Sequence, residues 1–159
     1  MNKTFFTIAI VGILLLARAQ AGELQVGFAQ LSITPDIIDQ WVDVNDDAQF
    51  DPDIDLWTDV NGNGKFDAVW MAGFQNQRPA QGVKDNLMAV AVVIDDGKNR
   101  IGIVSADTVG LMRKFVLGVR EAVPVEWGLD YLMVHATHNH EGPDTQGLWG
   151  PGFFSSGVD

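Results

Sequence analysis

The sequence predicts an α/β fold, a mixed β-sheet with crossover helices, and three observations indicate it. Two apolar runs, residues 87–94 and 100–106, flank the turn-forming residues 95–99 and predict a β-hairpin. Residues 109–123 have the apolar spacing of an amphipathic helix, and residues 131–136 predict another core strand. A strand, a helix and a strand in this order predict a right-handed crossover between two parallel strands.

The remaining elements follow from local patterns. Residues 26–34 alternate between apolar and polar and predict a strand that Pro35 closes, whereas residues 87–94 suit a strand buried on both faces. The core-facing side of the predicted helix consists of Leu111, Met112, Phe115, Val116, Val119 and Val123. Functional residues are expected in the loops after the two parallel strands, which contain Asp107 and residues 137–147.

Residues 1–21 have the pattern of a secretory signal peptide. Lys3 precedes an apolar core over residues 5–17, and Ala19-Gln20-Ala21 has small residues at both positions that a signal peptidase recognises. The alternative, a retained transmembrane anchor, needs about 20 apolar residues, and this run is shorter. We therefore expect cleavage before Gly22, no stable membrane anchor afterwards, and a secreted, periplasmic or extracellular protein.

The charge of the mature chain excludes some partners. Without Lys3 and Arg18, 8 of the 10 basic residues remain against 21 acidic ones, a net charge of −13. Nucleic acid and anionic membranes would repel such a chain. The sequence has no cysteine, so an exported fold must rest on core burial or bound metal. The Gly-rich end, residues 148–159, has no closing element, and we expect residues 22–159 to be a partial domain, the N-terminal fragment of a longer protein.

Ten of the 21 acidic residues, all Asp, lie in residues 36–67, which we call the Asp-rich segment. One stretch has oxygen-bearing side chains at positions 1, 3, 5 and 9 of an EF-hand-type calcium loop, which are Asp59, Asn61, Asn63 and Asp67. Gly64 stands at position 6, where the backbone must turn, but Trp70 replaces the bidentate Glu of position 12. This spacing predicts a structural Ca²⁺ site.

A second series of the same kind begins at Asp43 and has Asp51 at position 9, but it lacks the glycine of position 6. Two such series resemble the calcium-binding repeats of dockerin and thrombospondin-type modules. We see no internal repeat beyond this pair. The alternative interpretation is a solvated acidic loop, as most charge runs are.

All three histidines of the chain are clustered, at His135, His138 and His140. In an extended segment, residues two apart point to the same side, so His138 and His140 are expected to face one pocket and His135 to point the opposite way. Two histidines separated by one residue after a strand are a common beginning of a Zn²⁺ site, which needs three or four protein ligands in all. The alternative is a histidine pair without metal.

The segment Thr-His-Asn-His-Glu-Gly-Pro, residues 137–143, resembles the Ala-Thr-His-Thr-His-Ser-Gly-Pro signature of the neutral (non-lysosomal) ceramidase family. Further similar segments, in the same order, are residues 26–35, 70–74, 87–95 and 101–107. The Asp-rich segment is the exception and is expected to be an insertion. The resemblance implies a zinc-dependent hydrolase that cleaves linear amide bonds of N-acyl compounds such as the sphingolipid ceramide.

The resemblance also implies roles for individual residues. His138 corresponds to a ligand of the catalytic zinc and His140 to a residue that orients substrate or water; the family's other ligands, a His, a Glu and a Tyr, lie further along the chain. Asp107 either accepts the free N–H of a ligating His and so fixes its tautomer, or is the N-cap of the helix at residue 109. His135 is not carried over and is interpreted as packing in the sheet.

Two acidic residues depart from the family pattern, Glu141 in place of Ser and Asp144 in place of Gly. They disfavour a long-chain amide and favour a more polar substrate, or Glu141 acts as a general base. The sequence thus predicts an exported amidase with Zn²⁺, structural Ca²⁺ and a small-molecule or lipid amide substrate, the fragment alone being inactive. The alternative is a calcium-binding extracellular attachment module without catalysis.

Overall fold

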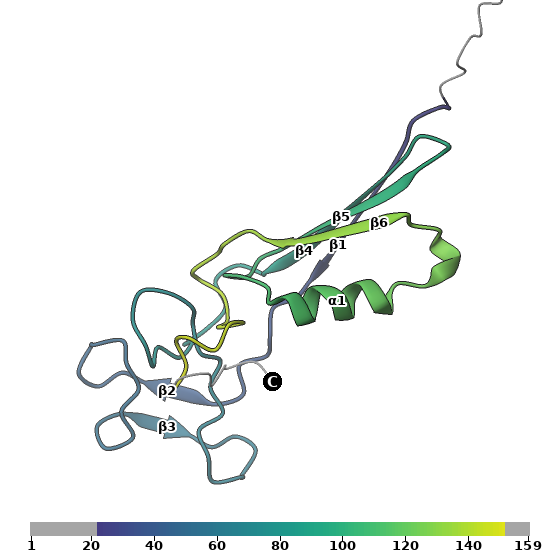
Figure 1. Cartoon of the computed structure of the whole chain (residues 1–159). Helices are drawn as coiled ribbons and strands as arrows, with labels where there is room; N and C mark the ends of the chain where they lie inside the picture. Colours follow the sequence, from purple (N-terminus) through teal and green to yellow (C-terminus); the bar gives the residue numbers. More distant parts are fainter. Residues whose placement is uncertain (1–21, 152–159) are drawn as a thin grey trace, which may run out of the picture.

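A computed structural model describes residues 22–151, and its main feature is a four-stranded mixed sheet (Figure 1). The strand order is β1-β4-β5-β6. Its strands are β1 (Gln25–Ser32), β4 (Met88–Asp95), β5 (Arg100–Ala106) and β6 (Tyr131–Ala136). Neighbouring strands are antiparallel except β5 and β6, which are parallel and joined through α1 (Arg113–Ala122) and the short η1 (Val125–Trp127). The predicted hairpin and parallel crossover are confirmed, although the described residues contain one crossover helix. The signal peptide predicted at residues 1–21 lies outside the described part.

The helix begins later than the sequence indicates. Its N-cap is Met112, so the prediction of a helix over residues 109–123 is wrong at its N-terminal end. The preceding backbone is held by another segment, because the Thr145 hydroxyl donates a hydrogen bond to the Gly110 carbonyl at 2.6 Å. The alternative role of Asp107 as the helix N-cap is therefore also wrong.

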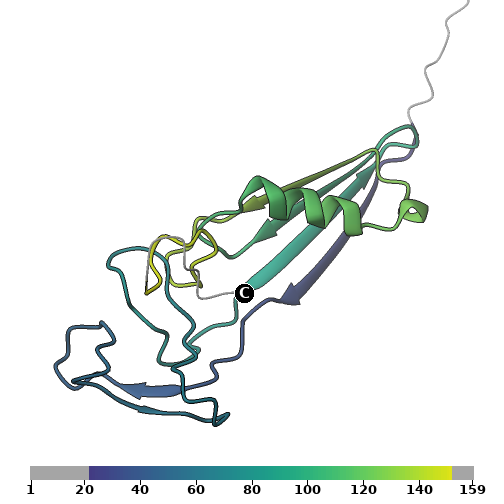
Figure 2. The ribbon, with the colours of Figure 1, turned by 60° about the horizontal axis from the view of Figure 1, so that its bottom comes forward.

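One face of the sheet is uncovered in the described residues. The helix α1 packs against β6 on the other face (Figure 2). The strand register places Phe28, Val92, Ile103 and Met133 side by side across the open face. Phe28 is 67% exposed, and β4 is half-buried along most of its length, so the prediction that residues 87–94 are buried on both faces is wrong here.

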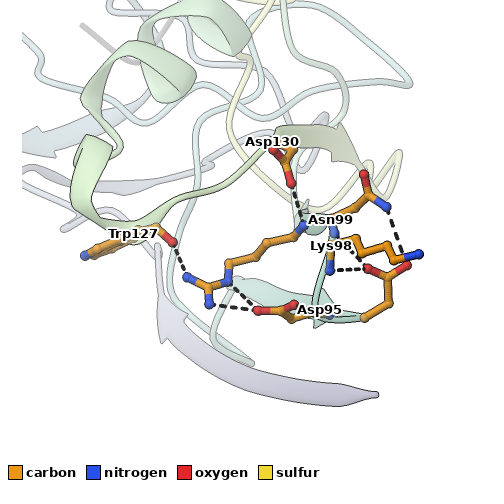
Figure 3. A network of polar contacts seen from close by, with 8 residues as sticks. Asp95, Lys98, Asn99, Trp127 and Asp130 are labelled. Atoms are coloured by element: carbon orange, nitrogen blue, oxygen red, sulfur yellow. Dashed lines mark hydrogen bonds and ion pairs between the residues drawn. The ribbon is translucent and has the colours of Figure 1, made fainter. Parts of the chain in front are cut away.

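Arg100 fixes the turn between β4 and β5 through its bonds to Asp95 and to the Trp127 carbonyl, two partners that Figure 3 labels. Its guanidinium donates to Asp95 through Nε at 2.8 Å, pairs with it through Nη2 at 2.7 Å, and donates to the Trp127 carbonyl at 2.6 Å. A hydrogen bond from the Gly97 N–H, and to a smaller extent one from the Arg100 side chain, holds the pKa of Asp95 below its ordinary value. This network bonds the hairpin to η1 at one end of the sheet. The loops at the opposite end therefore follow strands whose positions are fixed.

The Asp-rich segment contains β2 (Gln40–Val42) and β3 (Leu56–Thr58), which form a two-stranded antiparallel sheet beyond the end of the main sheet (Figures 1 and 2). Its two halves, residues 39–51 and 55–67, repeat one sequence pattern with a spacing of 16 residues. The identical pairs are Asp39/Asp55, Trp41/Trp57, Asp43/Asp59, Val44/Val60, Asn45/Asn61, Phe50/Phe66 and Asp51/Asp67. The repeat is thus wider than the paired Asp series that the sequence analysis recognised.

Buried carboxylates join the two halves reciprocally. Asp39, 1% exposed, accepts hydrogen bonds from the backbone N–H groups of Val60 and Asp67, residues two and nine of the later loop, at 2.9 and 2.8 Å. Asp55, 5% exposed, makes the equivalent two bonds to the earlier loop, at 2.9 and 2.8 Å. Each half therefore holds the loop of the other, as in a unit with pseudo-two-fold symmetry.

The same symmetry is visible in the aromatic side chains between the halves. Phe50 and Phe66 stack with ring centroids 3.9 Å apart. Each phenylalanine also packs against the tryptophan of its own half. The ring centroids are 6.0 Å apart for Trp41 and Phe50 and 5.6 Å apart for Trp57 and Phe66. These rings form a small core of their own for a segment that is otherwise rich in charge.

We expect Asp39→Ala to lower the free energy of unfolding by about 2–3 kcal/mol, because two backbone N–H groups lose a charged acceptor. Urea denaturation of the mature chain measures the change. Asp53→Ala, in the same segment but exposed, is the matched control and should change stability by less than about 0.5 kcal/mol. Equal stability of the two variants would contradict the anchoring role of Asp39.

Candidate metal centre

The loop after β6 continues to pair with the loop after β5. The Thr137 N–H donates to the Ala106 carbonyl at 2.9 Å, and the Asn139 N–H donates to the Thr108 carbonyl at 3.1 Å. Between these bonds His138 has φ = 64°, a left-handed conformation that is uncommon for residues other than glycine. The carboxyl ends of the two parallel strands therefore place His138 in a strained position, which is typical of functional sites.

The orientation of the His138 ring is set by a backbone carbonyl. His138 Nδ1 lies 2.8 Å from the Val109 oxygen. A carbonyl oxygen only accepts, so Nδ1 carries the proton and the neutral ring has its free lone pair on Nε2. This is the arrangement that orients metal-binding imidazoles in proteins. Asp107 is not the partner: its carboxylate accepts from the Thr137 hydroxyl at 3.1 Å and the Met88 N–H at 2.9 Å.

The rings of His138 and His140 meet. Their Nε2 atoms are 3.2 Å apart and their ring centroids 4.8 Å apart. Two nitrogens bound to one tetrahedral zinc ion are separated by about 3.3 Å, so this spacing fits a shared ion. In the described residues there is no group of three or more His, Cys, Asp or Glu side chains that could hold a metal.

His135 lies apart from this pair. It belongs to β6, and its side chain is on the face opposite to the one that α1 covers. The residue is exposed, and Nδ1 has its contact with the Ala136 carbonyl at 3.2 Å. Within the described part of the chain His135 therefore does not pack in a core, and the interpretation that it packs in the sheet is wrong there.

A turn over residues 70–79 holds His140 from the other side. Gly73 has φ = 81°, and a Cβ atom at this position would collide with the His140 ring. The Ala72 N–H donates to the Gly142 carbonyl at 2.9 Å and so fastens the turn to the loop after β6, residues 137–143, which we call the histidine loop. Phe74 follows, with φ = 62°, and the residue is 79% exposed. Its ring lies edge-on to His140, with ring centroids 5.7 Å apart.

Arg78 is a site residue that sequence reasoning missed. Its Nη2 donates to the carbonyls of His140 at 3.0 Å and Ala72 at 3.2 Å. Nη1 lies 3.6 Å from the Glu141 carboxylate. A positive group thus bonds the turn and the histidine loop together. The only signal in the sequence was its isolation, since no other arginine lies between Arg18 and Arg100.

The histidine loop has two sides. Thr137, Asn139 and Glu141 line a cavity of about 700 Å³, together with Asp107 and several apolar residues. Neither His138 nor His140 lines it. Thr137, Asn139 and Glu141 therefore face the cavity, whereas His138 and His140 do not. The Glu141 carboxylate lies near Arg78.

Asp144 is a structural residue. It is fully buried, and its two carboxylate oxygens accept hydrogen bonds from four backbone N–H groups at 2.7–3.2 Å. The donors are Gln146, Gly147, Trp149 and Gly150. This carboxylate folds the loop over residues 144–150, which corrects the interpretation that Asp144 favours a more polar substrate. The loop brings Trp149 to His140, with ring centroids 6.3 Å apart.

The residues of the calcium-type loop also come together. Both Asn61 and Asn63 donate side-chain hydrogen bonds to Asp67 Oδ2 at 2.6 Å. The Asp59 carboxylate accepts three backbone N–H bonds of the same loop, at 2.6–3.1 Å. Gly64 has φ = 74°, and in the earlier half Ala48 has φ = 60° at the matching position. The four oxygen-bearing side chains of the later loop are therefore arranged around one turn.

Comparison of the chain with known protein families, curated protein sequences and solved structures gives no match. Within residues 22–151, no helix is long and apolar enough to cross a membrane.

We expect Gly73→Ala to displace the His140 ring and to lower stability by at least about 1 kcal/mol, because alanine disfavours the left-handed backbone and its methyl group collides with the imidazole. Imidazole NMR signals should move for His140 more than for His135. Gly82→Ala is the control, since a Cβ at Gly82 meets no atom within 4 Å. Unchanged His140 signals in Gly73→Ala would contradict this packing.

Proposed function

We propose that the protein is an exported zinc-dependent amidase of the neutral ceramidase superfamily, which hydrolyses an N-acyl linkage. The observation that carries the proposal is the convergence of the His138 and His140 Nε2 atoms, 3.2 Å apart, at the carboxyl ends of β5 and β6. The fixed tautomer of His138 supports it, because the ring is oriented without metal in the way a ligand requires.

The residues present fit part of a zinc site. His138 would hold the ion through Nε2, and the resemblance to ceramidases supplies a His, a Glu and a Tyr from further along the chain as the other ligands. Zinc bound there supplies Lewis acidity, which polarises an amide carbonyl and makes water nucleophilic near neutral pH. The Val109 carbonyl keeps the ligating nitrogen in place.

We assign proton transfer, and the orientation of substrate or water, to His140 rather than to Glu141. His140 Nε2 points at His138 Nε2, whereas the Glu141 carboxylate lies beside Arg78 and lines the cavity on the other side of the loop. As a general base, Glu141 would have to leave Arg78 first. His140 is held by the Arg78 bond to its carbonyl and by Gly73 behind its ring, so its orientation costs little in the reaction.

In the full-length protein, we expect His138→Ala to lose zinc and amidase activity together, because a ligand is missing. His140→Ala should keep most of the zinc and lower kcat by about 10²–10⁴, the range of a lost general acid or base. Metal analysis and kinetics on the same preparations separate the two roles.

His135→Ala is the matched control and should keep both zinc and rate, since its side chain lies on the other face of the sheet. Loss of zinc in His135→Ala with retention in His138→Ala would overturn the assignment. Loss of zinc in both His138→Ala and His140→Ala would make His140 a second ligand, as the 3.2 Å separation permits.

A second candidate function is a calcium-binding extracellular module without catalysis. The arrangement of Asp59, Asn61, Asn63 and Asp67 around one turn favours Ca²⁺ in the Asp-rich segment. In the enzyme this ion would be structural; in the alternative it would be the functional part. Zinc bound through imidazoles distinguishes the enzyme from a module that binds Ca²⁺ alone.

We expect Ca²⁺ to raise the melting temperature of the mature chain, because an ion that binds only the folded state stabilises it by about 2.7 kcal/mol at 100 times its Kd. Mg²⁺ should do less, since it demands tighter octahedral geometry. Asp59→Ala should remove the response, and exposed Asp53→Ala should retain it. An equal response of Asp59→Ala and the unchanged chain would show that these aspartates are only solvated.

A further inference from the structure

The cavity beside the histidine loop has the size of a small-molecule site. Its volume is about 700 Å³, and pockets that bury most of a small ligand range over about 300–1,000 Å³. Most of its lining comes from residues 34–37 after β1, residues 82–87 before β4, and the histidine loop. His138 and His140 are not among the lining residues, so a ligand in this cavity is separate from the imidazole pair.

Much of the cavity wall is apolar. Ile37, Met71, Val83 and Leu87 are among the side chains that line it. A wall of this kind favours the apolar body of a ligand, because each methylene that leaves water raises the affinity about three- to fourfold. The wall therefore suits a ligand with a hydrocarbon part, and the polar groups of the cavity decide which head group such a ligand carries.

The charged side chains at the cavity are mainly acidic. Three carboxylates line it, those of Asp85, Asp107 and Glu141. Lys84 is the one basic residue among the described lining, so three negative charges stand against one positive charge, a net charge of −2. Glu141 pairs with Arg78 at 3.6 Å, but its side chain is 68% exposed, and water weakens such a pair. The cavity therefore attracts cations, as does the mature chain as a whole.

Asp107 is the carboxylate that the fold fixes in place. Its oxygens accept hydrogen bonds from the Met88 N–H at 2.9 Å and from the Thr137 hydroxyl at 3.1 Å. Both donors are uncharged, and within residues 22–151 this half-buried carboxylate has no cationic partner. A charge that is partly withdrawn from water and left unpaired is costly. A ligand that carries a positive charge would supply the missing partner.

We propose that this cavity is a second binding site of the protein, which takes a small organic cation with an apolar body, such as a primary alkylammonium ion. The ammonium group pairs with Asp107, and Asp85 and Glu141 strengthen the attraction. The alkyl body lies against the apolar wall. The site is separate from the proposed zinc centre, so the inference does not rest on the amidase. Because residues of the lining alternate with His138 and His140 along the histidine loop, occupancy should also shift the imidazole NMR signals of this pair.

Calorimetric titration of the full chain with n-hexylammonium, 1-hexanol and hexanoate, at neutral pH and low salt, tests the site. The three probes share one alkyl chain and differ in charge. We expect hexylammonium to bind about tenfold or more tightly than the other two, because it alone supplies a charged partner for Asp107. Butylammonium, two methylenes shorter, should bind about tenfold more weakly than hexylammonium. Equal binding of the three hexyl probes, or no binding of hexylammonium, would overturn the proposal.

Variants locate the binding. Asp107→Asn keeps the size of the side chain and should weaken hexylammonium binding about tenfold or more. Asp85→Asn changes an exposed residue that the fold does not depend on, and it should weaken binding about twofold. Glu126→Gln is the matched control, because it removes the same charge from exposed η1, beside the β4–β5 hairpin, and should leave the Kd unchanged. An equal loss in Glu126→Gln, or unchanged binding in both aspartate variants, would overturn the site.

His138→Ala separates this site from the proposed zinc centre. Hexylammonium should bind this variant as it binds the unchanged chain, whether or not the amidase reaction is found. Loss of binding in His138→Ala would place the cation at the imidazole pair and overturn the second site.

Discussion

The histidine site depends on the junction between the turn over residues 70–79 and the loop after β6. The Asp144 N–H donates to the Trp70 carbonyl at 2.7 Å, the Ala72 N–H donates to Gly142, and Met71 pairs with Pro143 as an isolated β-bridge. These are backbone hydrogen bonds between two extended segments, so they satisfy N–H and C=O groups in the way that neighbouring strands of the main sheet do. Through them the Asp-rich segment, which leads into the turn, is attached to the strands that carry His138 and His140.

The acidic side chains of this protein serve mainly to hold backbone. Asp39, Asp55 and Asp144 are buried, and each accepts hydrogen bonds from N–H groups of a loop that has no sheet or helix to bond to. Charged acceptors of this kind contribute more than neutral ones. A chain without disulfides can fix long irregular segments in this way, and a high count of aspartates then says less about metal than it first suggests.

The features that could be predicted from the sequence are those that depend on residues close together along the chain. The β4–β5 hairpin and the parallel crossover follow from local periodicity and are present in the structure. The start of α1 could not be derived from local periodicity, since the backbone before it is bonded to Thr145, 35 positions later in the sequence. Arg78 acts on His140 across 62 positions of sequence, and the burial of Asp144 depends on how its own loop closes. The 16-residue repeat, in contrast, is present in the sequence identities alone, and it includes Trp and Phe as well as Asp and Asn.

The reciprocal bonds of Asp39 and Asp55 have a consequence for how the Asp-rich segment can vary. The buried carboxylate that bonds positions two and nine of each loop belongs to the other half, so one half alone would lose these two bonds and leave its own buried aspartate without a partner. We therefore expect the two halves to fold together. Over evolutionary time the two halves can be gained or deleted together. Removal of a single half would leave the buried aspartate of the other half without its hydrogen-bond donors.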